Sequence, residues 1–261
     1  MKTKIQDMTS GSPGRLIILF AIPLMLGNIC QQLYTMVDTM VVGQIAGVEA
    51  LAALGAVDFL MWVVTGISTG LTQGFSIQLS QYYGAKDFEN LRKSLAHSYR
   101  LTAFIAAGVL ILSQSFASLV LTGLHTPSNI IGMSLLYLRI IFCGIPATAA
   151  YNMFASALRA MGNSKTPLTA MIIASVLNVS LDILFVAGFG WGVAGAAIAT
   201  VIAQSFSAVY CFLILRRIDI VHLTRADFMP ASGMNARLMK LGIPVAVSYT
   251  HLRAHETAAN L

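Results

Sequence analysis

Residues 16–43 read LIILFAIPLMLGNICQQLYTMVDTMVVG, an apolar run that contains a single charged residue, Asp38. About 20 apolar residues suffice to cross the hydrocarbon core of a bilayer. The apolar residues are continuous and do not alternate with polar ones, so the run predicts a helix that satisfies its own backbone inside lipid. It is much longer than the roughly 7–15-residue apolar region of a signal peptide, and no small-residue cleavage site ends it. We therefore expect a retained first membrane span.

Five further runs of the same kind follow, and the composition of the whole chain agrees with them. Hydrophobic residues make up 57% of the sequence and charged residues only 10%, whereas soluble proteins carry about 25% charged residues. A soluble domain could not hide that much apolar surface. The sequence predicts an all-α polytopic membrane protein with a six-helix lobe over residues 16–215, whose spans are 16–43, 50–82, 97–123, 130–158, 167–188 and 192–215.

Positive charges gather in alternate connections between these runs. If residues 1–15 are cytoplasmic, every Lys and Arg lies on the cytoplasmic side except Arg139, inside the fourth run, and Arg253, near the end of the sequence. This asymmetry follows the positive-inside rule and predicts a multi-pass protein of the cell membrane with a cytoplasmic N-terminus. The net charge of +6 does not indicate nucleic-acid binding, because no basic run carries interleaved aromatic residues.

A short internal echo follows the sixth run. Residues 240–244 (KLGIP) resemble residues 19–23 (LFAIP), and each segment follows an Arg-Leu pair. Internal repeats are the usual architecture of secondary transporters. We therefore expect residues 216–236 to be a cytoplasmic linker between two lobes, and residues 237–246 to begin the seventh helix, the first of a second lobe.

The last residues of the sequence do not fit this repeat. From Val247 the chain reads VSYTHLRAHET, which is polar and charged where a span should continue. The string resembles the translation of a transposon-type sequencing adapter. We expect residues 247–261 to be a non-native read-through tail, so His251 and His255, one helical turn apart, are not interpreted as a metal pair.

Away from the cytoplasmic ends of the predicted spans, four acidic or basic residues lie inside them, namely Asp38, Asp58, Arg139 and Asp182. Such residues are costly in lipid and are functional by default. From a rise of about 1.5 Å per residue, Asp38 lies near the outer end of span one, and the other three lie roughly 9–12 Å from the outer ends of their spans. All four therefore fall in the outer half of the bilayer, although they come from four different helices.

Polar residues on neighbouring spans reach a similar depth. Asn178 stands four residues before Asp182, so both project from one face of span five. Thr200 in span six and Tyr137 in span four lie at about the same level. Carboxylate, amide and hydroxyl oxygens can coordinate Na⁺, and a buried carboxyl group can instead bind a proton.

Each of these residues also has a plainer interpretation. Asp182 and Asn178 could form a structural hydrogen-bonded pair between helices, and Thr200 could be a packing residue. Asp38 could be an interfacial residue near a helix end, and Asp58 could stand at the mouth of a water-filled cavity without a specific task. Arg139 could pair with one of the carboxylates or simply stabilise the fold.

Strings that resemble enzyme motifs occur in the sequence only outside the strand–turn–helix context that those motifs need. There is no P-loop and no HExxH; the GxSxG string at residues 66–70 lies inside the predicted second span, and the GxGxxG string at residues 190–195 lies at the start of the predicted sixth span. The sequence therefore predicts neither an enzyme nor a bound cofactor. Coupling to a gradient of H⁺ or Na⁺ is the simplest source of energy for transport, and the buried carboxylates supply the means.

Several motifs resemble those of the multidrug and toxic compound extrusion (MATE) transporters. They occur in the expected order at the expected spans, over about residues 10–240. The matching segments are Gln32–Gly43 (QLYTMVDTMVVG) with Ala52–Gly55 (AALG), Ser80–Lys86 (SQYYGAK), Arg159–Pro167 (RAMGNSKTP) and Asn178–Asp182 (NVSLD).

This resemblance, to the prokaryotic DinF-like branch of the family, implies a twelve-helix protein with two six-helix lobes around a V-shaped cavity. It implies export of cations by alternating access, with a cation site in the first lobe. That site would map to Asp38, Asn178, Asp182 and Thr200, with Tyr137 nearby. Asp58 matches no recognised family position. The C-terminal lobe of the same protein would hold the rest of the cavity, so this fragment should not transport alone.

Two functions are therefore expected from the sequence. The first is a secondary active antiporter that exports small organic cations and drugs across the lipid bilayer in exchange for H⁺ or Na⁺; if Na⁺ is used, its ligands would be Asp38, Asn178, Asp182 and Thr200. The alternative is a flippase for lipid-linked precursors from the same wider superfamily. A flippase of anionic pyrophosphate lipids would be expected to line its cavity with several Arg or Lys residues. Away from their cytoplasmic ends, the spans here contain one basic residue, Arg139, and three Asp residues. This balance of charge favours the antiporter.

Overall fold

The computed structural model describes residues 12–229 and 231–259, and within them the chain is helical with no strand. Residues 1–11 of the expected cytoplasmic N-terminus and residues 260–261 of the expected tail lie outside the described residues. The elements are α1 (Pro13–Val41), η1 (Val42–Ala46), α2 (Val48–Gly84), α3 (Phe88–Gly123), α4 (Ile131–Cys143), α5 (Ile145–Ala160), α6 (Lys165–Asp182), η2 (Ile183–Gly188), α7 (Gly192–Leu215), η3 (Asp219–Val221), η4 (Arg225–Phe228) and α8 (Met234–Ala259). This arrangement confirms the predicted all-α architecture.

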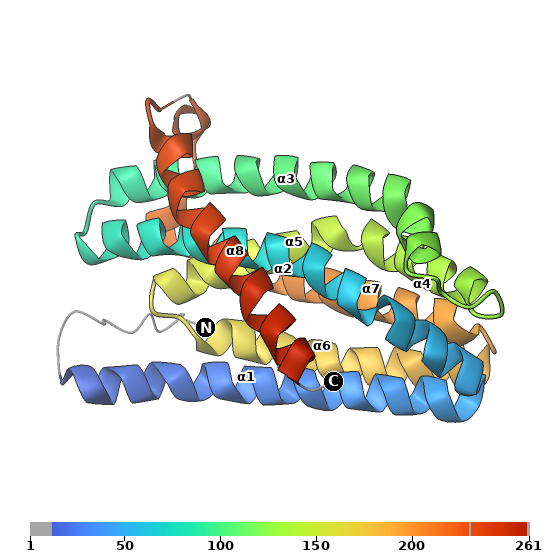
Figure 1. Ribbon diagram of the computed structural model, residues 1–261. Helices are drawn as coiled ribbons and strands as arrows, with labels where there is room; N and C mark the ends of the chain where they lie inside the picture. The colour runs from blue at the N-terminus through green and yellow to red at the C-terminus, as the bar shows by residue number, and fades with distance from the viewer. Residues whose placement is uncertain (1–11, 230, 260–261) are drawn as a thin grey trace.

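The long helices lie side by side in a bundle, with α1 and α3 on opposite sides and α8 crossing the others obliquely (Figure 1). Within the described residues, five helical segments are long and apolar enough to cross a membrane, and a bent pair, α4 with α5, makes a sixth. The outer faces of the bundle are apolar; on α1, for example, Ile17 and Met25 are more than half exposed. Such a surface is stable in lipid and not in water.

The fourth span differs from the single helix expected over residues 130–158. It is broken at Gly144 into α4 and α5, whose axes meet at 45°. A Cβ atom on Gly144 would lie 2.6 Å from Cγ2 of Val201, so only a glycine lets α7 approach this closely. Pro146 in the first turn of α5 fits the break, because proline has no N–H to donate.

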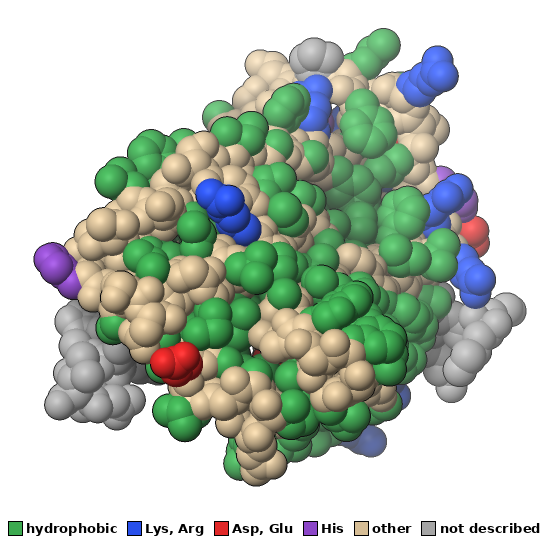
Figure 2. Space-filling model, turned by 90° about the vertical axis from the view of Figure 1, so that its right-hand side faces the viewer, with side chains coloured by type: hydrophobic (Ala, Val, Ile, Leu, Met, Phe, Trp, Pro, Cys, Tyr) green, Lys and Arg blue, Asp and Glu red, His purple; other side chains and the backbone are tan. Residues whose placement is uncertain are grey.

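The two ends of the bundle differ in charge. The connections α2–α3 and α5–α6, with the helix turns that flank them, and the chain after α7 carry most of the described Lys and Arg residues. These segments share one end, which we call the basic end. The other end is formed by the α1–α2, α3–α4 and α6–α7 connections. Figure 2 looks onto this second end, where hydrophobic side chains alternate with backbone and other uncharged groups, and charged side chains are few.

The first turns of α8 pack against α2 without intervening side chains. A Cβ atom on Gly74 would lie 2.4 Å from Cα of Gly242, and one on Gly70 would lie 2.4 Å from Cα of Ala246. Small residues at intervals of four let two helical backbones approach closely in a membrane. The segment expected to begin a second lobe is therefore joined tightly to α2.

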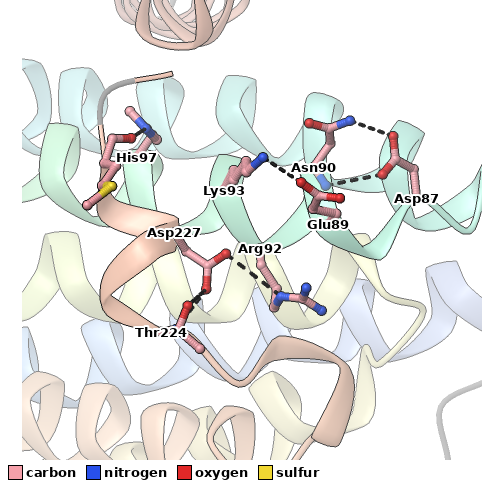
Figure 3. A network of polar contacts seen from close by, with 9 residues as sticks. Asp87, Glu89, Asn90, Arg92, Lys93, His97, Thr224 and Asp227 are labelled. Atoms are coloured by element: carbon pink, nitrogen blue, oxygen red, sulfur yellow. Dashed lines mark hydrogen bonds and ion pairs between the residues drawn. The ribbon is translucent and has the colours of Figure 1, made fainter. Parts of the chain in front are cut away.

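The stretch between α7 and α8 folds onto the basic end of α3. Asp227 closes a capping box with Thr224: its carboxylate accepts hydrogen bonds of 2.7 Å from the backbone N of Thr224 and 2.8 Å from the Oγ1 of Thr224. The same carboxylate lies 3.8 Å from Nε of Arg92 (Figure 3). The buried His97 ring contacts Oδ1 of Asn235 at 2.7 Å and the carbonyl oxygen of Met229 at 3.0 Å. Residues expected to form a linker are thus fixed to α3 by hydrogen bonds.

The mixed-charge segment 86–93 includes the first turns of α3. Asp87 is the N-cap, and its carboxylate accepts bonds of 3.1 Å from the backbone N and 2.7 Å from Nδ2 of Asn90. The hydrogen bond from the Asn90 side chain, and to a lesser extent the one from its backbone N, hold the pKa of Asp87 below its ordinary value. Lys93 and Glu89 pair at 2.6 Å one turn further on. This part of α3 is the solvated helix face that its composition indicates.

Candidate functional site

Helix α6 supplies two of the expected residues. Asn178 is 2% exposed and Asp182 is fully buried, as their spacing of four on one helix face predicts. Asp182 is the last residue of α6, and the π-helical segment η2 begins directly after it. π-Helical turns in the middle of a span frequently mark functional sites.

Helix α1 brings Asp38 to the same place. Its side chain is 7% exposed, and its carboxyl group lies close enough to that of Asp182 for the two to form a hydrogen bond when one carries a proton. Helix α1 also changes to a π-helix, η1, four residues after Asp38. The segments η1 and η2 contact one another beside the acidic pair.

Thr200 and Tyr137 complete the set expected from the sequence. Nδ2 of Asn178 donates to Oγ1 of Thr200 across 3.3 Å, which joins α6 to α7. Tyr137, on α4 and 5% exposed, lies within electrostatic range of both Asp38 and Asp182. The structure therefore brings together all five residues of the expected site.

A cavity opens beside these residues between α1, α5, α6 and α7. It encloses about 370 Å³ of empty space, including its open mouth, and leaves about 30 Å³ for the centres of water-sized molecules. Asn178 and Thr200 line it, whereas Asp38 and Asp182 stand beyond its lining. The other lining residues are Gln31, Tyr34, Tyr151, Met171, Ala174, Ser175, Ala203, Gln204 and Ser207.

Acceptor oxygens outnumber donors in this region. The buried oxygens without a hydrogen-bond partner include Oδ1 of Asp38, both carboxylate oxygens of Asp182, Oδ1 of Asn178 and Oε1 of Gln204. Buried polar atoms are normally paired, so a cluster of unpaired acceptors calls for a cation, a proton or water. Among the described residues, no three His, Cys, Asp or Glu side chains are placed so that they could hold one metal ion together. The chemistry of this donor-poor set suits a proton or a hard cation held by a few oxygens.

Neither Asp58 nor Arg139 lines the cavity, although Asp58 lies within electrostatic range of Tyr137. Both side chains are exposed, Asp58 on α2 and Arg139 on α4. Among the described residues Arg139 forms no ion pair with a carboxylate. Its backbone oxygen accepts a bond of 2.8 Å from Nε2 of Gln114 on α3. One interpretation of Arg139 was that it pairs with one of the carboxylates inside the spans. The structure provides no acidic partner for it among the described residues.

Tyr34 and Gln204 were not anticipated from the sequence. Both line the cavity, and Tyr34 lies within hydrogen-bonding range of Gln204. A signal for them exists, because Tyr34 precedes Asp38 by four residues and Gln204 follows Thr200 by four. The helical spacing that links Asn178 to Asp182 also applies to these two pairs.

These features define a polytopic membrane protein with a buried acidic site beside a cavity, and comparison with known proteins places it in a family. The MatE family model matches residues 23–184. The chain belongs to the MatE family, whose members are membrane transporters and not enzymes.

The curated relatives are about twice as long as this chain. It is 31% identical to "Probable multidrug resistance protein YpnP" of Bacillus subtilis, over 94% of this chain and 55% of the relative. It is 26% identical to "Probable multidrug resistance protein NorM" of Thermotoga maritima, over 88% of this chain and 50% of that protein. The chain thus spans about half the length of the curated relatives it matches.

Solved structures show the same fold. The chain superposes with a TM-score of 0.88 and 26% identity on a MOP superfamily transporter from Pyrococcus furiosus, over 95% of this chain and 55% of that one. The same TM-score, identity and coverage relate it to an outward-facing MATE family multidrug resistance transporter. The chain therefore has the fold of about half of a MATE transporter.

Proposed function

We propose that the protein is a secondary active antiporter that exports small organic cations in exchange for H⁺ or Na⁺, and that this chain supplies the site for the coupling ion. The observation that carries the proposal is the buried pair Asp38 and Asp182, in which Oδ1 of Asp38 and both carboxylate oxygens of Asp182 lack protein donors. Ionisable residues are retained inside a membrane where they serve ion or substrate pathways. The names of the relatives, multidrug resistance and multidrug export proteins, support the substrate class.

The lining of the cavity supports a cationic substrate. It contains no Lys or Arg, and it offers the aromatic faces of Tyr34 and Tyr151 and the flexible side chain of Met171. Aromatic rings attract organic cations, and methionine adapts to ligands of different shape. The nearby carboxylates make this region more favourable for positive than for negative charge.

In the proposed mechanism, a proton or Na⁺ from outside binds at Asp38 and Asp182, with Asn178 and Thr200 as further oxygen ligands for Na⁺. Binding neutralises the acidic pair, which removes the attraction for the cationic substrate. The loss of charge also changes the packing of α1 against α6, whose π-helical ends meet at the site. Substrate leaves outward, and the ion is later released to the cytoplasm, where the basic end of the bundle is proposed to lie.

The proposal is tested with the complete gene product in everted membrane vesicles. Uptake of the fluorescent cation ethidium is followed under an imposed proton or sodium gradient, for the wild type and for Asp182→Asn. We expect uptake under one of the two gradients, which identifies the ion, and its loss in the variant. Normal export by Asp182→Asn would refute the role of the pair.

The alternative is a flippase for anionic lipid-linked precursors. The Pyrococcus furiosus transporter with the same fold was described as having a binding pocket of reverse polarity that suggests a different function, so members of this fold differ in the charge of their pockets. The cavity of this chain carries no basic residue in its lining, which is the opposite of what an anionic pyrophosphate needs. Absence of ethidium uptake under either gradient, together with translocation of a lipid-linked precursor in vesicles, would establish the flippase.

A further inference from the structure

A second, smaller cavity lies between α2, α3 and α5, away from the acidic pair. It is lined by Ser68, Thr72 and Thr102 together with Leu71, Phe75, Ile105 and Ala149. On α5, Ala149 lines this cavity, and Tyr151, two residues later, lines the cavity of the candidate site. Residues two apart on a helix point in nearly opposite directions. Helix α5 therefore separates the two cavities.

Two of the three hydroxyl groups that line this second cavity have no hydrogen-bond partner among the described residues. Oγ of Ser68 and Oγ1 of Thr102 are buried, with side chains 4% and 7% exposed, and neither forms a hydrogen bond within the described part of the chain. A buried polar group without a partner costs about 1–3 kcal/mol. Thr72 differs, because its hydroxyl bonds to the carbonyl oxygen of Ser68 at 3.0 Å on its own helix. Two groups are thus left to be satisfied from within the cavity.

The space available fits one small neutral ligand. The cavity leaves about 10 Å³ for the centre of a water molecule, and a single buried water needs roughly 10–15 Å³ of such space. No charged residue lines the cavity. Hydroxyl groups both donate and accept, so they match water better than they match a cation.

Further unpartnered groups connect this cavity to the basic end of the bundle. Ser94 and Ser98 precede Thr102 by eight and four residues on α3, so all three share one helix face. Both serines are fully buried, and neither Oγ has a partner. Oε1 of Gln78 on α2 is also unpartnered. Gln78 and Ser94 each stand roughly 9 Å along their helix from the α2–α3 connection.

We propose that the second cavity is an internal hydration site: a water molecule bridges Ser68 and Thr102 and exchanges with solvent at the basic end along Ser98 and Ser94. From Ser94 to Thr102 this route covers roughly 12 Å of α3. It brings water to the face of α5 opposite the candidate site. The inference rests on the unpartnered hydroxyls and the cavity, and it stands whether or not the protein couples to an ion.

Radiolytic footprinting of the complete protein in lipid nanodiscs tests the site, because a buried water produces hydroxyl radicals that label adjacent side chains. Phe75 lines the cavity and is fully buried, whereas Phe142, 3% exposed, belongs to a different cluster of the core. We expect oxidation of Phe75 several-fold above that of Phe142. Equal labelling of the two rings would overturn the proposal, and this comparison needs no variant.

Variants then assign the ligands and the route. Ser68→Ala with Thr102→Val should abolish the excess labelling of Phe75, whereas Ser205→Ala should not, because the Ser205 hydroxyl bonds to Val201 O on its own helix at 2.7 Å. Ser94→Ala with Ser98→Ala should slow the appearance of ¹⁸O label at Phe75 after transfer to H₂¹⁸O. Labelling that persists without Ser68 and Thr102 would show that these hydroxyls do not hold the water. An unchanged ¹⁸O exchange rate would refute the route.

Discussion

Asp38 of α1 and Asp182 of α6 place two buried carboxyl groups beside each other, although their helices are far apart in the sequence. Two carboxylates this close to one another cannot both be ionised without a large repulsion, so a cation or a proton is needed between them. Replacement of either residue should therefore affect the same step of transport, which is binding of the coupling ion.

We predict that Asp38→Asn and Asp182→Asn each reduce gradient-driven ethidium uptake to the level without a gradient, and that the double variant is no worse than either single one. Residues that act as a unit give such non-additive losses. The measurement is initial uptake in everted vesicles, with protein amount checked by immunoblot. Independent, additive losses would indicate two separate sites.

The contact between Asn178 and Thr200 can be tested with a matched pair of variants. Thr200→Val removes the hydroxyl that accepts from Nδ2 of Asn178 and leaves a buried amide unpaired, at a cost of about 1–3 kcal/mol. Thr200→Ser keeps the hydroxyl. We expect a lower thermal midpoint and weaker ion-dependent uptake for Thr200→Val than for Thr200→Ser. Equal behaviour of the two would show that Thr200 only fills space.

The exposed Asp58 should behave differently from the acidic pair. It does not line the cavity, and its side chain is exposed on α2. Asp58→Asn should keep gradient-driven uptake, because the groups that would bind the coupling ion are untouched. The apparent affinity for ethidium in the same vesicle assay shows whether the carboxylate attracts substrate. Complete loss of coupling in Asp58→Asn would place Asp58 in the ion site.

The glycine contact between α2 and α8 predicts a packing defect. A side chain on Gly74 meets Cα of Gly242, a backbone atom that cannot rotate away. Gly74→Val should separate the helices and destabilise the protein by about 1–3 kcal/mol or more. The control is Gly108→Val on α3, where no neighbour lies within 4 Å. The measurement is the thermal midpoint of the purified protein, and equal midpoints for the two variants would contradict the contact.

The N-cap of α3 gives a prediction for pH. The hydrogen bonds from Asn90 depress the pKa of Asp87 in the folded protein, so this carboxylate stabilises the helix end above its unfolded pKa of about 3.9. The stabilisation is lost as pH falls through the folded pKa. Asp87→Ala should lower the hydrogen-exchange protection factors of residues 88–91 at neutral pH and make those protection factors insensitive to acid. Asp87→Ser, which keeps a capping oxygen, should lie between the variant and wild type.

Most of the fold follows from hydropathy, because a helix that crosses lipid needs a long apolar run and little else. The break at Gly144 was missed, since the apolar run continues through it and its cause is the approach of Val201 from a distant helix. Hydropathy placed the start of the third span at residue 97, whereas α3 begins at Phe88, because its first turns lie outside the membrane and carry mixed charge. Their helical state depends on the Asp87 cap, which hydropathy does not detect.

The candidate site shows the same division. Asn178 and Asp182 could be paired from their spacing alone, and depth estimates brought Asp38, Tyr137 and Thr200 to their level. The contact of Asp38 with Asp182 requires α1 to pack on α6, which no local pattern specifies. The π-helical segments that follow both acids have no sequence signature of their own. Tertiary packing decides these features.

The close contact of α8 with α2 also bears on how the protein is made. Chains emerge from the ribosome in order, and domains generally fold as units from the N-terminus. Gly242 and Ala246 meet α2 directly, so the start of the second half can dock on a finished six-helix unit while later residues are still being synthesised. The first lobe would then act as the template on which the rest of the transporter is inserted and oriented.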